Sequence, residues 1–124
     1  MAKFMVLLTD DPSYWATCTP EQMQEVIKQY VAWSMKTHAT KRIKVGHKLA
    51  DEGGKRLLKG RGKVKVTDGP FAESHEVIGG FYVLEADSYA HCIELLADHP
   101  HLVHGQRIDV RAIEEVRARG RRKK

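Results

Sequence analysis

A nine-residue segment in the middle of the chain carries more acid/base chemistry than a turn requires: Asp68-Gly69-Pro70-Phe71-Ala72-Glu73-Ser74-His75-Glu76. It lies between two runs of strand-like composition, Lys63–Thr67 and Gly79–Ala86. Gly69-Pro70 turns the chain, because glycine tolerates unusual φ values and proline fixes its own φ. The segment therefore reads as a catalytic or binding loop at the end of a rigid sheet, or as a polar turn in a small domain.

Asp68 is the first candidate for catalysis. A carboxylate at the end of a strand, partly shielded by Phe71, is suited to act as a general base. The competing interpretation is that aspartate before glycine is a common turn former. His75 in the same loop and His47 in an upstream strand are candidate proton-transfer partners, or ordinary loop and strand histidines. The loop residues that we expect to contact a ligand are Pro70, Phe71 and Glu73, although Glu73 also suits a surface ion pair.

Four further histidines, His91, His99, His101 and His104, gather near the end of the second predicted long helix. The last two have a spacing compatible with a shared metal, but no acid or thiol stands at a matching interval, and zinc sites need three or four converging ligands. We predict no metal site. The sequence also lacks a P-loop, GxGxxG, GxSxG or CxxC motif, so we predict no cofactor.

The elements that position these residues follow from apolar patterning and from Gly and Pro positions. Thr19-Pro20 opens one helix, and Asp87 or Ser88 caps a second. The pattern predicts strands at Lys3–Leu8, Arg42–Leu49, Gly79–Ala86 and Gln106–Ile113, a hairpin of Lys55–Lys59 with Lys63–Thr67, and a short helix over Glu114–Arg119. This order predicts an α+β domain: a ferredoxin-like antiparallel sheet with two helices on one face and an extra β-hairpin.

The strands Phe4–Leu8 and Phe81–Leu84 are apolar on both faces. Two helices cover only one face of the sheet, so the other face needs another layer. A second copy packing sheet against sheet is the simplest solution, and we therefore predict a homodimer.

The net charge of +5 is unevenly distributed. The last eight residues hold six cations and no acid, which leaves 15 cations against 16 acids in the remaining chain. We interpret the tail, within residues 114–124, as a solvated terminus, and nucleic-acid binding is not expected because no aromatic residues alternate with its cations. Two isolated cysteines and the lack of a signal-like or membrane-spanning segment favour a cytoplasmic location without membrane association.

The loop, followed by Gly79-Gly80-Phe81-Tyr82, resembles the signature of DGPF-domain proteins within the YCII-related family. The resemblance covers residues 1–113 and is specific at the loop. It implies a fold of the dimeric α/β-barrel type, acid/base chemistry suspected in related proteins through a His and an Asp, and a frequent genetic link to extracytoplasmic-function sigma factors.

Two hypotheses follow. In the first, a small cytoplasmic dimer binds a small molecule in a cleft beside the loop and catalyses a proton transfer, such as an isomerisation or dehydration, with Asp68 as base and His75 or His47 assisting. In the second, the protein is a non-catalytic ligand-binding or regulatory module associated with a transcription system.

Overall fold

The computed structural model describes residues 2–50, 52–69 and 77–116. The elements follow one another as β1 (Ala2–Asp10), α1 (Pro12–Ala16), α2 (Pro20–His38), β2 (Ile43–Lys48), β3 (Lys55–Lys59), β4 (Val64–Asp68), β5 (Val77–Ala86), α3 (Tyr89–Leu96), α4 (Pro100–Val103) and β6 (Arg107–Ala112). All predicted strands and both long helices are present.

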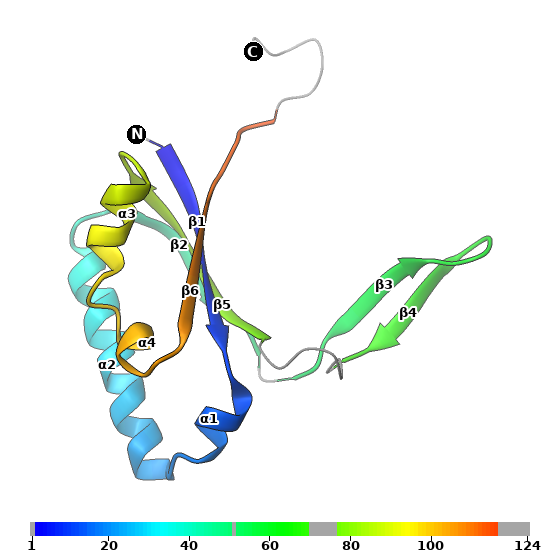
Figure 1. The fold of residues 1–124 in the computed structure, drawn as a ribbon, viewed down its shortest axis with the longest axis horizontal. Helices are drawn as coiled ribbons and strands as arrows, with labels where there is room; N and C mark the ends of the chain where they lie inside the picture. The colour runs from blue at the N-terminus through cyan, green and yellow to red at the C-terminus, as the bar shows by residue number, and fades with distance from the viewer. Residues whose placement is uncertain (1, 51, 70–76, 117–124) are drawn as a thin grey trace.

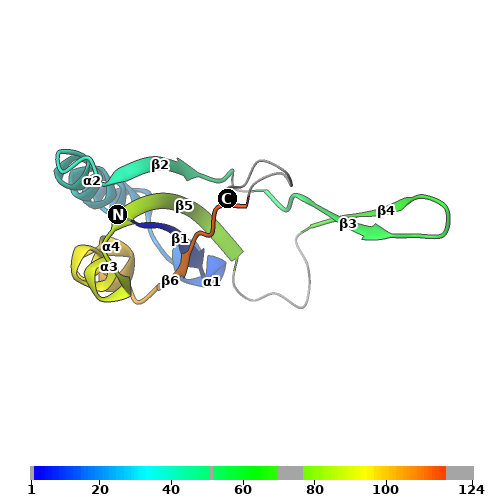
Figure 2. The same cartoon turned by 90° about the horizontal axis from the view of Figure 1, so that it is seen from above.

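The main sheet has four antiparallel strands in the order β2-β5-β1-β6, and α2 and α3 lie together on one of its faces (Figure 1). Strands β3 and β4 form a separate two-stranded sheet, the β3–β4 ribbon. Figure 2 shows the ribbon extending away from the sheet, on the side opposite α2 and α3. The predicted fold class, a ferredoxin-like α+β domain with two helices on one face of an antiparallel sheet and an extra hairpin, is confirmed.

The core lies between the sheet and the two long helices. Alternation along β1 directs Phe4, Val6 and Leu8 toward the helices, as expected from a strand period of two. The core is completed by residues of β5, α2 and α3: Leu84, Ala86, Trp33, Cys92 and Leu96. On α2 the buried residues are Val26, Trp33 and Thr37, whereas Ile27 and Val31, which also stand at helical spacing, are about half exposed.

Helix α2 begins as the sequence predicts. The Thr19 side chain accepts a hydrogen bond from the Gln22 backbone N–H at 3.1 Å, and the Gln22 side chain accepts one from the Thr19 N–H at 2.8 Å. This capping box, with Pro20 in the first turn, satisfies two backbone donors that the helix leaves unpaired.

Two short helices were not predicted, because their prolines look like breaks in the sequence. Pro12 and Pro100 each stand in the first turn, where a missing N–H costs nothing. Asp11 caps α1 and His99 caps α4. Conversely, the short helix predicted from Glu114 is wrong over its described part, residues 114–116, which are not helical. Val116 there is 80% exposed, so this segment lacks the packing that a short helix needs.

A bulge in the β1–β5 pairing places Asp10 at the end of the core. The register shifts after Leu8, so that Leu8 faces Gly80 while Thr9 faces Ile78. Gly79 is the extra residue, and a Cβ there would lie 1.8 Å from Asp10 Oδ2. Only glycine leaves room for this carboxylate beside the β5 backbone.

Candidate functional site

The residues at α4 bring three histidines to one end of the core, and each of them is hydrogen-bonded to a tyrosine hydroxyl. His99 pairs with Tyr82 of β5 at 3.0 Å, and His101 pairs with Tyr30 of α2 at 2.6 Å. His104 pairs with Tyr14 of α1 at 3.1 Å. Three elements far apart in the sequence, β5, α2 and α1, thus converge on a stretch of six residues, 99–104, and we call these three pairs the histidine–tyrosine network.

His99 is fully buried and is held as a neutral imidazole. Its Nδ1 accepts the backbone N–H of His101 at 2.9 Å, so the ring proton lies on Nε2 and is donated to the Tyr82 hydroxyl. Burial, and secondarily the neighbouring His101, lower the pKa of His99 to about 4. The Trp33 ring lies against it, with centroids 4.3 Å apart. This histidine caps a helix and fills the core.

His101 is also buried and neutral. Its Nε2 donates to the Thr9 carbonyl at 2.8 Å, so its Nδ1 accepts from the Tyr30 hydroxyl. Burial lowers the pKa of His101, and the Thr9 bond and the Asp10 carboxylate, 3.6 Å from Nε2, oppose that effect. Burial and the nearby Asp10 raise the pKa of Tyr30 well above its ordinary value. The His101 ring therefore stays neutral, with one proton on Nε2, and the Tyr30 hydroxyl keeps its proton.

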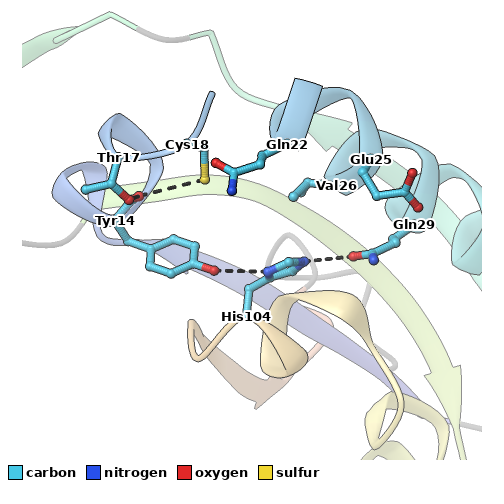
Figure 3. A pocket seen from close by; sticks show the side chains of 8 residues that line it. All are labelled: Tyr14, Thr17, Cys18, Gln22, Glu25, Val26, Gln29 and His104. Atoms are coloured by element: carbon cyan, nitrogen blue, oxygen red, sulfur yellow. Dashed lines mark hydrogen bonds between the residues drawn. The ribbon is translucent and has the colours of Figure 1, made fainter. Parts of the chain in front are cut away.

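His104 differs from the other two because it borders open space. Between α1 and α2 lies a pocket of about 340 Å³, with His104 and Tyr14 on its wall (Figure 3). The other lining residues are mostly polar: Thr17, Cys18, Gln22, Glu25, Val26 and Gln29. Figure 3 shows Tyr14, His104 and Gln29 in a row along one side of this pocket.

The hydrogen bonds of this Gln29–His104–Tyr14 row all run in one direction, from the Tyr14 hydroxyl to His104 and from His104 to Gln29. The Gln29 carboxamide oxygen accepts from His104 Nε2 at 2.7 Å, so His104 Nδ1 is free to accept the Tyr14 hydroxyl proton. A base oriented by a third group, with a hydroxyl at hydrogen-bonding distance, is the arrangement that activates oxygen for proton transfer. Asp10 supports the same region, because its Oδ1 accepts from the Trp15 indole N–H at 3.1 Å.

The sequence-predicted site residues lie elsewhere or outside the described residues. Asp68 ends β4 on the ribbon, with a side chain 75% exposed and an ion pair to Lys55 at 2.5 Å. His47 is an exposed residue of β2, and its ring lies 5.7 Å from that of Phe81. No contact found within the described residues joins Asp68 to His47. The remaining predicted residues, Pro70, Phe71, Glu73 and His75, lie outside the described part of the chain.

Sequence reasoning missed the histidine–tyrosine network because the tyrosines are scattered along the chain. The signal that was available, three histidines within residues 99–104, was weighed only as a metal site. In the structure their ring nitrogens are used in hydrogen bonds to protein groups, and the described residues contain no group of three or more His, Cys, Asp or Glu that could hold a metal ion.

Two observations bear on cysteines and membranes. Cys18, at the pocket, and Cys92, in the core, are both free thiols. Among the helices in the described ranges, none is long and apolar enough to cross a membrane.

The fold and the pocket define a ferredoxin-like α+β domain with a polar cavity between its helices and the end of its core. The YCII-related domain family matches residues 2–117, and the chain belongs to this family. No curated protein matches the chain. Among solved structures it is similar to 5-chloro-2-hydroxyhydroquinone dehydrochlorinase from Burkholderia phenoliruptrix in complex with 2,5-dihydroxybenzoquinone, with 18% identity and a TM-score of 0.52. That alignment covers 92% of this chain and 95% of the dehydrochlorinase, and it supports the fold alone.

Proposed function

We propose that the protein binds a small polar organic molecule in the pocket between α1 and α2 and catalyses a proton transfer on it. The observation that carries the proposal is the row Gln29–His104–Tyr14 on the wall of that pocket. Of the three histidine–tyrosine pairs, it alone borders the cavity, whereas His99 and His101 are buried.

The proposed chemistry needs no group beyond these side chains. The Tyr14 oxygen takes a proton from the bound molecule while the Tyr14 hydroxyl proton moves to His104 Nδ1. The Gln29 carboxamide oxygen accepts a hydrogen bond from Nε2–H throughout and so holds the imidazolium in place. Returning a proton from the row to another atom of the molecule completes an isomerisation. In an elimination the leaving group departs with the electron pair of its bond, and the imidazolium gives its proton to the leaving group or to water. Imidazole suits this task because it exchanges protons near neutral pH.

The size and polarity of the pocket indicate the class of ligand. About 340 Å³ is enough for a single substituted ring, and the lining hydroxyl, amide and carboxylate groups suit hydroxyl substituents. The ligand of the structurally similar dehydrochlorinase, 2,5-dihydroxybenzoquinone, belongs to that class and supplies a probe.

Calorimetric titration with 2,5-dihydroxybenzoquinone tests the proposal when it is carried out in two buffers of different ionisation enthalpy. We expect binding linked to proton exchange in the wild type. Tyr14→Phe should weaken binding by roughly tenfold, the value of one good hydrogen bond. His104→Gln should abolish the linked proton exchange, and His38→Gln, on the exposed end of α2, is the matched control.

Absence of binding up to about 1 mM, or equal affinity for wild type and Tyr14→Phe, would reject the pocket as the site. Binding without proton exchange would instead favour the second hypothesis, a non-catalytic ligand-binding or regulatory module. Catalysis by Asp68 with His75 or His47, and ligand contacts by Pro70, Phe71 and Glu73, remain proposals that rest on the loop signature.

We also propose that the protein is a cytoplasmic homodimer formed through the open face of the main sheet. The register places Leu7 beside Phe81 and Met5 beside Val83, with Val45 of β2 next to Val83. This apolar patch lies opposite α2 and α3, and a second copy is the layer that would cover it. The cytoplasmic location is proposed because Cys18 and Cys92 are free thiols, which suit a reducing compartment.

Light scattering at low micromolar concentration tests the dimer. We expect twice the chain mass for the wild type and the chain mass for Phe81→Asp, which places a charge in the centre of the face. A wild-type monomer at that concentration would refute the dimer.

A further inference from the structure

The β3–β4 ribbon is built differently from the rest of the molecule. Its two strands pair only with each other, from Lys55 opposite Asp68 to Lys59 opposite Val64. Figures 1 and 2 both show it projecting from the body as a free-standing arm. Every described residue from 57 to 68 is exposed except Gly60, which is intermediate. The ribbon contributes nothing to the core described above.

Charge is separated along the chain more strongly than its total suggests. Residues 41–67 hold ten cations and two acids, whereas the rest of residues 1–116 holds five cations and 14 acids. The near-zero charge of this part of the chain thus conceals a basic segment of net +8 and an acidic remainder of net −9. Within residues 55–67 there are six cations and no acid.

Most of the cations on the arm form no ion pair with a carboxylate of the described residues. Lys55 pairs with Asp68 at the base of the ribbon. Among the described residues, no carboxylate pairs with the four outer cations, Lys59, Arg61, Lys63 and Lys65. Three of them surround the bend at Gly60 and Gly62, where Gly62 has a φ of +71°. The positive charge is therefore concentrated at the tip, the part of the arm farthest from the main sheet.

We propose that the β3–β4 ribbon is a binding arm for duplex nucleic acid. A two-stranded β-ribbon fits a groove of the duplex, and lysine and arginine along it neutralise phosphates. The register leaves cations on both faces, with Lys59 on the face of Leu57, Val64 and Val66, and Lys65 on the face of Arg56 and Leu58. An arm inserted in a groove has phosphates on both sides, which matches this two-sided charge.

The composition of the arm favours a duplex over a single strand. Residues 55–67 contain no aromatic side chain, so they offer no platform on which unpaired bases stack. The expectation against nucleic-acid binding was drawn from the tail and from the summed charge of the remaining chain. Neither quantity reports where the cations of residues 55–65 lie.

Fluorescence anisotropy of the full-length protein with a labelled DNA duplex of about 20 base pairs tests the proposal. With four phosphate contacts, affinity should fall roughly 100-fold between about 50 and about 200 mM salt. The ribbon variant Lys59→Gln/Arg61→Gln/Lys63→Gln/Lys65→Gln should lose most of the affinity and of the salt dependence. Its circular dichroism spectrum should match the wild type, because all four side chains are exposed.

The matched control removes the same charge from the tail: Arg119→Gln/Arg121→Gln/Arg122→Gln/Lys123→Gln. It should keep most of the affinity for the duplex. Loss of binding in the tail variant but not in the ribbon variant would overturn the proposal. Equal or tighter binding of a 20-nucleotide single strand would also overturn it. So would binding to vesicles containing phosphatidylserine without binding to the duplex, or self-association through the ribbon without either.

Discussion

Around α4 the histidine side chains are buried or half-buried and each is hydrogen-bonded to a tyrosine. On the β3–β4 ribbon, by contrast, the polar side chains are exposed and most of the charged ones are cations. His99 and His101 are 0% and 2% exposed, and each ring nitrogen has a partner. Lys59 and Lys65 on the ribbon are exposed and lie in a strand pair that has no third strand beside it among the described residues.

The difference shows where substitutions should change stability and where they should change binding. A buried polar group must be satisfied, so the histidines of α4 are fixed by the fold and changes there affect stability. An exposed ribbon is only marginally stabilised by its own pairing, and changes there affect what it binds. His104 is the point where the buried network reaches the pocket and becomes available for chemistry.

The largest difference in the free energy of unfolding is expected between a substitution in the core and one on the ribbon. Trp33→Ala removes a ring that is 4% exposed, stacks with Tyr82, lies against His99 and donates its indole N–H to Asp98 at 3.0 Å. It should lower the free energy of unfolding by about 3–5 kcal/mol. Leu57→Ala on the ribbon, 64% exposed, should change it by less than about 0.5 kcal/mol. Urea denaturation of both variants measures the contrast, and comparable losses would show that the ribbon is part of the folded core.

The pH dependence of stability sharpens the same comparison. The pKa of His99 is lowered by burial to about 4, so the unfolded chain binds a proton that the folded chain excludes. Stability is therefore full above the unfolded pKa of about 6.5 and falls as the pH drops toward 4, by roughly 3 kcal/mol from this residue. Denaturation midpoints between those pH values measure the loss. His99→Asn should flatten the curve, and an unchanged slope in this variant would assign the pH dependence to other groups.

The bulge that places Asp10 supplies a smaller effect. Gly79→Ala puts a methyl group where the Asp10 carboxylate lies and should cost roughly 1–3 kcal/mol. If the clash is the cause, the same substitution in an Asp10→Ala background should cost much less. A double-mutant cycle by thermal denaturation tests this. Additive losses would mean that Gly79 matters for backbone reasons alone.

The smallest effect is expected at the C-terminus. Deleting Arg117–Lys124 removes six cations and a single apolar residue, Ala118. The melting temperature should stay within about 1 °C of the wild type, because little apolar area is lost. Differential scanning calorimetry makes the measurement. A large decrease would show that the tail docks on the domain.

The sequence predicted the sheet and the long helices because local patterns decide them. The capping box at Thr19 and Gln22, the Ser88 cap and the alternation of β1 are all readable within a few residues. The exposure of single helix residues is not readable in the same way. Ile27 and Val31 fit an apolar stripe but are exposed, because the sheet contacts the side of α2 that carries Val26 and Trp33.

The pocket between α1 and α2 could not be read from the sequence for a related reason. Asp68 was chosen because several acid/base residues stand close together in sequence, whereas the Gln29–His104–Tyr14 row joins residues up to 90 positions apart. Gly69, beside Asp68, also has a purely structural reason to be glycine, since a Cβ there would lie 2.0 Å from the Gly53 carbonyl oxygen.

By itself, then, the sequence determined the order of elements, the ferredoxin-like arrangement and the basic character of the tail, because propensity, capping and strand period act over short distances. Only the tertiary structure decided which histidines are buried and neutral, that His104 is the histidine of the three that borders the pocket, and that the cations of residues 55–65 lie on a ribbon that projects from the main sheet. Burial and electrostatic surroundings depend on contacts between distant segments, and those contacts exist only once the chain has folded.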